Sequence, residues 1–202
     1  INSKFTFGTD TWCDYYDLGY GVNGVYMSGN QFSWTTGDFG HAFFGMQKTD
    51  VYNGGSVTYW TVTYGTGSFT PAYTPRPADA YYSGYGSDVV FVGLDRSSGT
   101  VMRLWRWTDP WAGGAFTITN VTVPAYSAAP TAWQPSGRTW YGFDARLLDA
   151  VITRKVADSN YHLLTCQNLN VSGEMGVRLY DIDVPGNAVR WTYNVWGGAN
   201  TT

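Results

Sequence analysis

The sequence predicts an all-β protein. Aromatic residues make up 18% of the 202 residues, there are 25 Gly and 8 Pro, and charged residues are only 13%. This balance favours strands and turns over helices. Apolar residues also alternate over short runs, and almost no stretch has the 3.6-residue period of an amphipathic helix. The length fits a single all-β domain over residues 1–202.

The first group of expected strands covers about residues 16–64. Its apolar runs are "YDLGYGV", "GVYMSGNQF", "HAFFGMQKTDV" and "SVTYWTVTY". The segments "VNG", "SWTTGDFG" and "YNGG" connect them. Short connections rich in Gly, Asn and Asp join neighbouring antiparallel strands. We therefore expect a four-stranded antiparallel meander.

Two further groups have the same organisation. The second, at about residues 78–124, contains "ADAYYSGYG", "DVVFVGLDRS", "TVMRLWRWT" and "AFTITNVTVP". The third, at about residues 138–196, contains "ARLLDAVITRK", "NYHLLTCQNL", "GVRLYDIDV" and "AVRWTYNVW". Each group has four strands joined by tight turns, which again predicts a meander.

An internal repeat links the three groups. Segments starting at Ala42, Val89 and Leu148 each have an apolar strand, a turn with Lys or Arg, and an aromatic-bearing strand. A four-stranded unit recurring about every 40–50 residues is typical of a β-propeller blade. We therefore expect a propeller-type array of about three blades. The alternative is a β-sandwich, which would show the same alternation but need not repeat in fours.

Three blades cannot close a ring, because propellers typically have four to eight. The ring would then be completed by a fourth sheet from the termini, by a second copy, or by the rest of a longer chain. The first residue is Ile1, which we interpret as a processed chain or part of a longer one. Two copies of three blades would make six.

Two stretches resemble bacterial secreted or surface β-propeller proteins. The first is "DLGYGVNGVYMSGNQF" followed by "FFGMQKTDVYNGG". The second is "LWRWTDPWAGGAFTITNVTVPAYSAAPTAWQPSG" followed by "FDARLLDAVITRK". The resemblance extends roughly from Asp17 to Val195, and it departs at "RKVADSNYH", where that family often has an Arg-Asn-Gly turn. It implies a propeller fold, whereas the function of these proteins is poorly defined.

Charge and composition limit the partners. The net charge is -3 and there is no basic run, so nucleic acid is not an expected partner. No apolar run approaches the roughly 20 residues that span a bilayer. Few Lys, many Tyr, Trp, Ser, Thr and Gly, and glycosylation sequons at Asn120, Asn170 and Asn200 favour a secreted or cell-surface glycoprotein.

The two cysteines, Cys13 and Cys166, lack the spacing of metal ligands. No metal or other cofactor is therefore expected. An oxidising compartment would allow a disulfide between them. Two free or buried thiols are the alternative.

Carboxylates at the starts of inner strands are the candidates for catalysis, since glycoside hydrolysis uses paired carboxylates. They are Asp17, Asp79, Asp88, Asp144 and Asp149. Within "FDAR", Asp144 lies beside Arg146 and could bind a hydroxylated or anionic substrate. We name Asp144, Arg146 and Asp79 as catalytic candidates, while turn capping by Asp is the alternative. There is no Gly-x-Ser-x-Gly motif, and His41 and His162 have no evident triad context.

Aromatic residues are the candidates for ligand binding. Four tryptophans in strands are expected mainly in the core: Trp60, Trp105, Trp107 and Trp191. Others lie in loops or at strand ends beside small polar residues, where an indole can stack on a sugar ring. The glycan-binding candidates are Trp34, Trp111, Trp133 and Trp140, with Asn30 as a polar contact. Packing of loops or subunits is the alternative role, and Asn30 could instead bond to the backbone of the following turn.

These expectations lead to three hypotheses about function. The first is an extracellular propeller module for binding or structural assembly, with glycans or neighbouring subunits as ligands and no catalysis. The second is a propeller glycoside hydrolase or lyase that uses channel carboxylates. The third is a structural subunit of a surface filament or layer.

Overall fold

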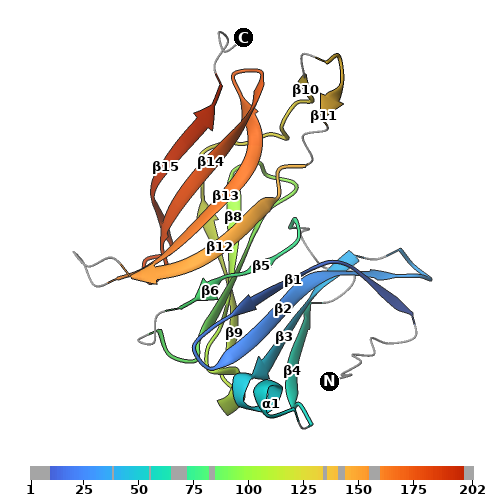
Figure 1. Cartoon of the computed structure of the whole chain (residues 1–202), viewed down its shortest axis with the longest axis vertical. Coiled ribbons are helices and arrows are strands. Elements are labelled where there is room, and N and C mark those ends of the chain that lie inside the picture. The colour runs from blue at the N-terminus through green and yellow to red at the C-terminus, as the bar shows by residue number, and fades with distance from the viewer. Residues whose placement is uncertain are drawn as a thin grey trace.

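The computed structural model describes residues 10–37, 39–54, 56–64, 72–81, 85–133, 136–140, 144–154 and 160–197. It confirms the all-β class, with 61% strand and 6% helix. The strands form three larger sheets and one short hairpin, and the hairpin consists of β10 (Ala132–Trp133) and β11 (Thr139–Trp140) (Figure 1). No described helix is long and apolar enough to cross a membrane.

Sheet 1 is the expected N-terminal meander. Its strands, in spatial order, are β1 (Thr11–Tyr20), β2 (Gly24–Ser33), β3 (Phe39–Gln47) and β4 (Tyr59–Tyr64). One part of the expectation is wrong, because the third strand does not continue to Val51. The helix α1 (Lys48–Asn53) follows β3 directly and ends at Gly54, whose φ of 69° gives the left-handed cap that glycine adopts at low cost.

Sheet 2 lies in the middle of the molecule. Its strands, in spatial order, are β5 (Arg76–Pro77), β7 (Val89–Leu94), β8 (Val101–Trp107) and β9 (Phe116–Thr122). A short 3-10 helix, η2 (Pro110–Ala112), connects β8 to β9. The three long strands are those expected from the sequence.

Sheet 3 contains the expected C-terminal meander and one additional strand. The strands are β15 (Ala188–Trp196), β14 (Glu174–Asp183), β13 (Tyr161–Val171), β12 (Leu147–Arg154) and β6 (Asp79–Ala80). The segment "ADAYYSGYG" was expected to begin the second group, and that assignment is wrong. The Ala78 N–H still bonds to Val90 of sheet 2, but the next two residues pair in parallel with β12. The extended chain thus passes from one sheet to the next.

Both faces of sheet 2 are buried. On one face Val89, Phe91 and Trp105 pack with Tyr26 and Phe43 of sheet 1. On the opposite face lie the alternate residues of the same strands, including Val90, Val92 and Leu104. These pack with sheet 3 residues that include Leu147, Ile152, Leu163 and Ile182. The period-two alternation of a strand explains how β7 and β8 serve two cores.

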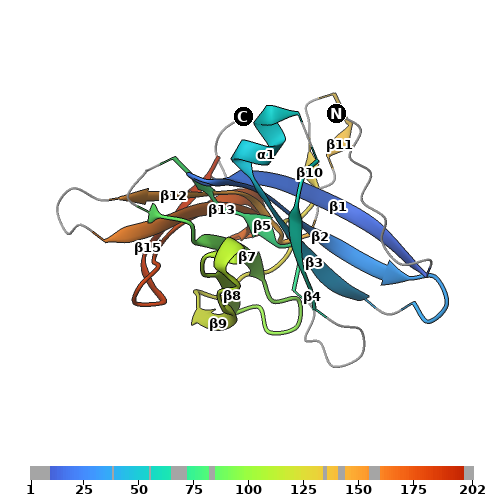
Figure 2. The ribbon, with the colours of Figure 1, turned by 90° about the horizontal axis from the view of Figure 1, so that it is seen from below.

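The three sheets fan out from the region of β5, which contacts β1, β2 and β12 (Figures 1 and 2). In Figure 2 sheet 1 lies on the right, β12 and β13 on the left, and β7 to β9 below. The described strands form no closed barrel or ring. The array therefore has two ends, one at sheet 1 and one at sheet 3.

Candidate functional site

The first strand, β1, runs along the seam where the three sheets meet. An ion pair joins Asp17 of β1 to Arg76 of β5, with Oδ2 and Nη1 3.0 Å apart. The Arg76 Nε also donates to the Leu147 carbonyl at 3.2 Å, so this one side chain connects all three sheets. A Cβ on Gly19 would lie 2.8 Å from the Pro77 Cβ. Glycine thus allows β1 to approach β5 closely.

Asp79 lies on the same seam. Its Oδ1 accepts a hydrogen bond from the Tyr20 N–H at 2.9 Å, and its Oδ2 accepts one from the Tyr81 hydroxyl at 3.3 Å. The Tyr20 and Tyr81 hydroxyls also bond to each other. Burial raises the pKa of Asp79, and the charges of Asp149 and Asp17 add to this effect, although the two hydrogen bonds oppose it.

Asp144 and Arg146 form a second cluster on the seam. Two parallel hydrogen bonds of 2.6 Å join the Arg146 guanidinium to the Asp144 carboxylate. The guanidinium carbon lies 4.0 Å from the centre of the Tyr15 ring. Tyr15 belongs to a bulge in β1 and has a φ of 52°, an unusual backbone conformation for tyrosine. The expected "FDAR" pair therefore exists, but its carboxylate is already bound by its own arginine.

The remaining carboxylate candidate, Asp88, lies elsewhere. Its Oδ1 accepts a hydrogen bond from the Asp109 N–H at 3.2 Å, next to η2. This is the turn-capping role that was the alternative to catalysis. The five carboxylates therefore do not form a single cluster, and only Asp17 and Asp149 contribute to the raised pKa of Asp79.

The glycan-binding candidates lie in different surroundings. Trp34 is 69% exposed and lies at the end of a row of rings that continues through Trp12 to Phe32. Trp111 of η2 lines a surface pocket of about 340 Å³. The side chains of Trp133 and Trp140, on the β10–β11 hairpin, lie outside the described residues.

Asn30 is not available to a ligand. It lies within β2 rather than at its end, and its side chain is buried. Its Nδ2 donates to the Thr74 Oγ1 at 2.9 Å. The expected bond to the following turn is therefore replaced by a bond that holds residues 72–75 against sheet 1.

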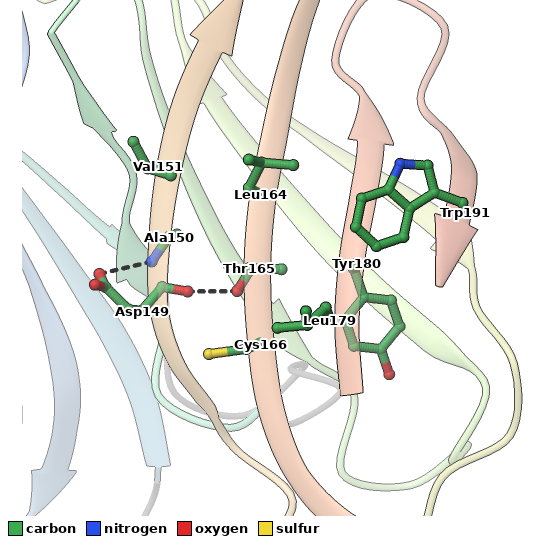
Figure 3. Close-up of a pocket in the computed structure, with 9 residues that line it drawn as sticks. All are labelled: Asp149, Ala150, Val151, Leu164, Thr165, Cys166, Leu179, Tyr180 and Trp191. Carbon is green, nitrogen blue, oxygen red and sulfur yellow. Dashed lines mark hydrogen bonds between the residues drawn. The ribbon is translucent and has the colours of Figure 1, made fainter. Parts of the chain in front are cut away.

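A pocket on the outer face of sheet 3 was not expected from the sequence. It has a volume of about 260 Å³ and is lined mainly by apolar side chains. Figure 3 shows Val151, Leu164, Cys166, Leu179 and Trp191 around it, on four adjacent strands. Asp149 lies at its edge, and its backbone carbonyl accepts a hydrogen bond from the Thr165 hydroxyl.

The pocket is part of a larger surface, here called the sheet 3 end face, whose exposed side chains are mainly apolar. It consists of Val151, Leu164, Cys166, Leu179, Trp191, Tyr193 and Val195. The buried ion pair of His162 and Asp181 lies on the same face of the sheet. Strand register places Trp191 opposite Asp181, Tyr193 opposite Leu179 and Val195 opposite Val177, on the face that points away from sheet 2. Trp191 is 45% exposed and Tyr193 is 63% exposed. The expectation that Trp191 lies in the core is therefore wrong, while Trp105 and Trp107 are buried as expected.

Both cysteines are free thiols in this structure, which is the alternative to a disulfide between them. Cys13 lies on β1 and Cys166 lies on β13, in different sheets. The Tyr16 hydroxyl donates to the Cys13 sulfur at 3.0 Å. Burial raises the pKa of both thiols. Within the described ranges, no group of three His, Cys, Asp or Glu side chains could hold a metal ion.

Two of the three sequons lie on described strands. Asn120 is exposed on β9, and Asn170 is exposed at the end of β13. The Asn170 Oδ1 accepts a hydrogen bond from the Gly173 N–H at 2.8 Å, a turn contact that does not involve the Nδ2 atom that glycosylation modifies. Asn200 lies outside the described residues.

Comparisons with protein-family models, curated proteins and solved structures found no match to this chain.

Proposed function

We propose that this chain is an extracellular, propeller-type assembly module whose end faces pack against a second copy of the chain. Two three-sheet arrays would then make one ring of six sheets, within the four to eight that propellers use. The ends of two arrays would pair in the same way as the sheets already do inside each chain.

The observation that carries the proposal is the contrast between the middle sheet and the ends. Sheet 2 covers both of its faces with neighbouring sheets. Sheet 3 buries one face against sheet 2 but leaves Leu179, Trp191 and Tyr193 exposed on the other. Soluble monomers rarely expose a large contiguous apolar surface, and such a surface commonly marks an interface.

Sheet 1 offers the matching surface at the other end of the array. Strand register places Leu18, Met27 and Phe44 in one row, on the face opposite the one that packs on sheet 2. Val25, Met46 and Tyr59 form the next row. Phe44 and Met46 are buried within the chain, whereas Leu18 is 61% and Tyr59 is 50% exposed. Packing of this sheet 1 end face on the sheet 3 end face of a second copy would continue the stack of sheets.

The reactivity of Cys166 tests the proposal, since this thiol belongs to the sheet 3 end face. We expect a bulky maleimide to label Cys166 slowly in the native protein and faster after dilution. The substitution Leu179→Asp should raise the labelling rate, because a carboxylate in an apolar interface opposes association. Mass spectrometry of the peptides would report Cys166 separately from Cys13.

The matched control is Tyr52→Asp, since Tyr52 is exposed on α1 and is not part of either end face. It should leave the labelling of Cys166 unchanged. Fast labelling of Cys166 in the native protein at every concentration would contradict the proposal.

The surroundings of Asp79 favour a second candidate function, cleavage of glycosidic bonds by hydrolysis or by β-elimination. Its pKa is raised and two further carboxylates, Asp17 and Asp149, lie close enough to affect it. A protonated carboxylic acid beside a carboxylate is the pair that glycosidases use. Release of reducing ends from a polysaccharide, lost in Asp79→Asn but retained in Asp88→Asn, would support this activity. Equal release by both variants would exclude Asp79 as the acid.

A further inference from the structure

The structure points to a sugar-acid binding pocket at the junction of sheets 1 and 2, and we propose that it takes a pyranose ring carrying a carboxylate. The pocket has a volume of about 340 Å³, at the lower end of the range for small-molecule sites. Its lining residues are Val22, Asn23, Gln47, Lys48, Thr49 and Trp111.

Three segments that are distant in the sequence build this pocket. Val22 and Asn23 come from the turn between β1 and β2. Residues 47–49 come from the junction of β3 and α1, and Trp111 comes from η2 of the middle sheet. The Lys48 N–H donates to the Asn23 carbonyl at 2.9 Å, and the Asn23 Nδ2 donates to the Ser87 hydroxyl at 3.2 Å. The first bond joins two of the three segments, and the second ties the turn to the residues that precede β7 in sheet 2.

The indole wall is held in place by close packing. The Trp111 ring stacks on Tyr26 with centroids 5.9 Å apart and meets Trp60 edge-on at 4.8 Å. A Cβ on Gly24 would lie only 2.6 Å from the indole, so the absence of a side chain there makes room for it. The indole therefore needs little reorganisation on binding, which reduces the entropic cost.

The polar groups of the pocket match the chemistry of a sugar acid. Within the described part of the chain, the side chains of Gln47 and Thr49 have no hydrogen-bonding partner, and an amide and a hydroxyl suit the hydroxyls of a sugar. Among the described residues of the lining, Lys48 is the only charged one. Its ammonium lies 5.5 Å from the centre of the Tyr20 ring, and no ion pair neutralises it among the residues described.

These groups account for both parts of the ligand. Trp111 provides an apolar wall for the C–H face of the ring, and the amide and hydroxyl bind its hydroxyl groups. The ammonium binds the carboxylate through a charge-assisted hydrogen bond. A neutral sugar would leave the lysine without a counter-charge, which is why we infer a preference for the acid.

The test is titration of the full chain with D-glucuronic acid and with D-glucose, followed by NMR or calorimetry. We expect glucuronic acid to bind at least tenfold more tightly than glucose. Lys48→Gln should abolish this preference, whereas Trp111→Phe should lower the affinity for both sugars. Arg138→Gln is the matched control, because Arg138 is an exposed cation on the turn between β10 and β11, and it should change neither affinity.

Three results would overturn the proposal. The first is no binding of either sugar to a folded protein, as judged by the NMR spectrum. The second is an unchanged preference in Lys48→Gln. The third is equal binding of acetate or inorganic phosphate, which would indicate a simple anion site. The pocket and the sheet 3 end face share no residues, so this proposal and the assembly proposal are tested independently.

Discussion

His41 should make the stability of the protein fall as the pH is lowered. The side chain is fully buried on β3, and the rings of Phe39, Phe43 and Trp105 contact it at nearly perpendicular angles. Burial lowers the pKa of His41 to about 3, and the charges of Arg103 and Arg96 contribute. The unfolded chain would protonate this histidine near its ordinary pKa of 6.5.

The sign and size of the effect follow from this difference. Between pH 6.5 and 3 the unfolded state binds a proton that the folded state does not, so the free energy of unfolding decreases as the pH falls. A pH of 5 lies about 1.5 pH units below the pKa of this histidine in the unfolded chain. The free energy of unfolding is therefore about 2 kcal/mol lower at pH 5 than at neutral pH. Above pH 7 the effect disappears.

The assay is urea unfolding of the native protein and of His41→Phe at pH 7 and at pH 5. Phenylalanine fits a site lined by aromatic rings and does not titrate. The native protein should lose about 2 kcal/mol more than the variant between the two pH values. The contributions of the other titrating groups cancel in this comparison, because both proteins contain them. Equal losses in both proteins would refute the assignment of a neutral buried histidine.

Three further predictions concern stability. Asp95→Ala should lower the free energy of unfolding by about 3–5 kcal/mol, because it leaves the buried guanidinium of Arg103 without its carboxylate; an effect under 1 kcal/mol in urea unfolding would contradict this. Asp144→Asn should cost at most about 1 kcal/mol in the same assay, since its pair with Arg146 is partly exposed. Gly19→Ala should cost about 1–3 kcal/mol, because the added Cβ meets Pro77 at 2.8 Å, and an unchanged thermal midpoint would show that β1 can shift at no cost.

The sequence predicted the strands well because their pattern is local. Each strand has its own alternation of apolar and polar residues, and Gly, Asn or Asp in the adjoining turns mark its ends. The continuation of β3 was predicted wrongly, since "QKTDVYNG" contains polar and apolar residues that suit a short helix ended by glycine as well as a strand.

The internal repeat was less informative than it looked. The segments starting at Val89 and Leu148 correspond to the hairpins β7–β8 and β12–β13, whereas the one starting at Ala42 corresponds to β3–β4. In sheet 1 this hairpin lies at the outer side of the meander, while β7 and β8 are the inner strands of sheet 2. An apolar strand, a basic turn and an aromatic strand describe many hairpins, and they do not fix a hairpin's place in its sheet.

The candidate sites depended on tertiary contacts that the sequence does not show. The pair of Asp144 and Arg146 was predictable because the residues are two positions apart, on the same side of an extended chain. The contact of Arg146 with Tyr15 was not, since it joins β1 of sheet 1 to the residue that precedes β12 of sheet 3. The exposure of Trp191 was also missed. The alternation of Trp191, Tyr193 and Val195 marks an apolar face, but only the order of the sheets shows that nothing in the described chain covers it.

The molar mass of the native protein in solution, measured by light scattering over a range of concentrations, tests the central proposal most directly. Pairing of the two end faces predicts twice the mass of one chain at high concentration, and a return to the single-chain mass for Leu179→Asp. A single-chain mass at every concentration would contradict the assembly of two three-sheet arrays.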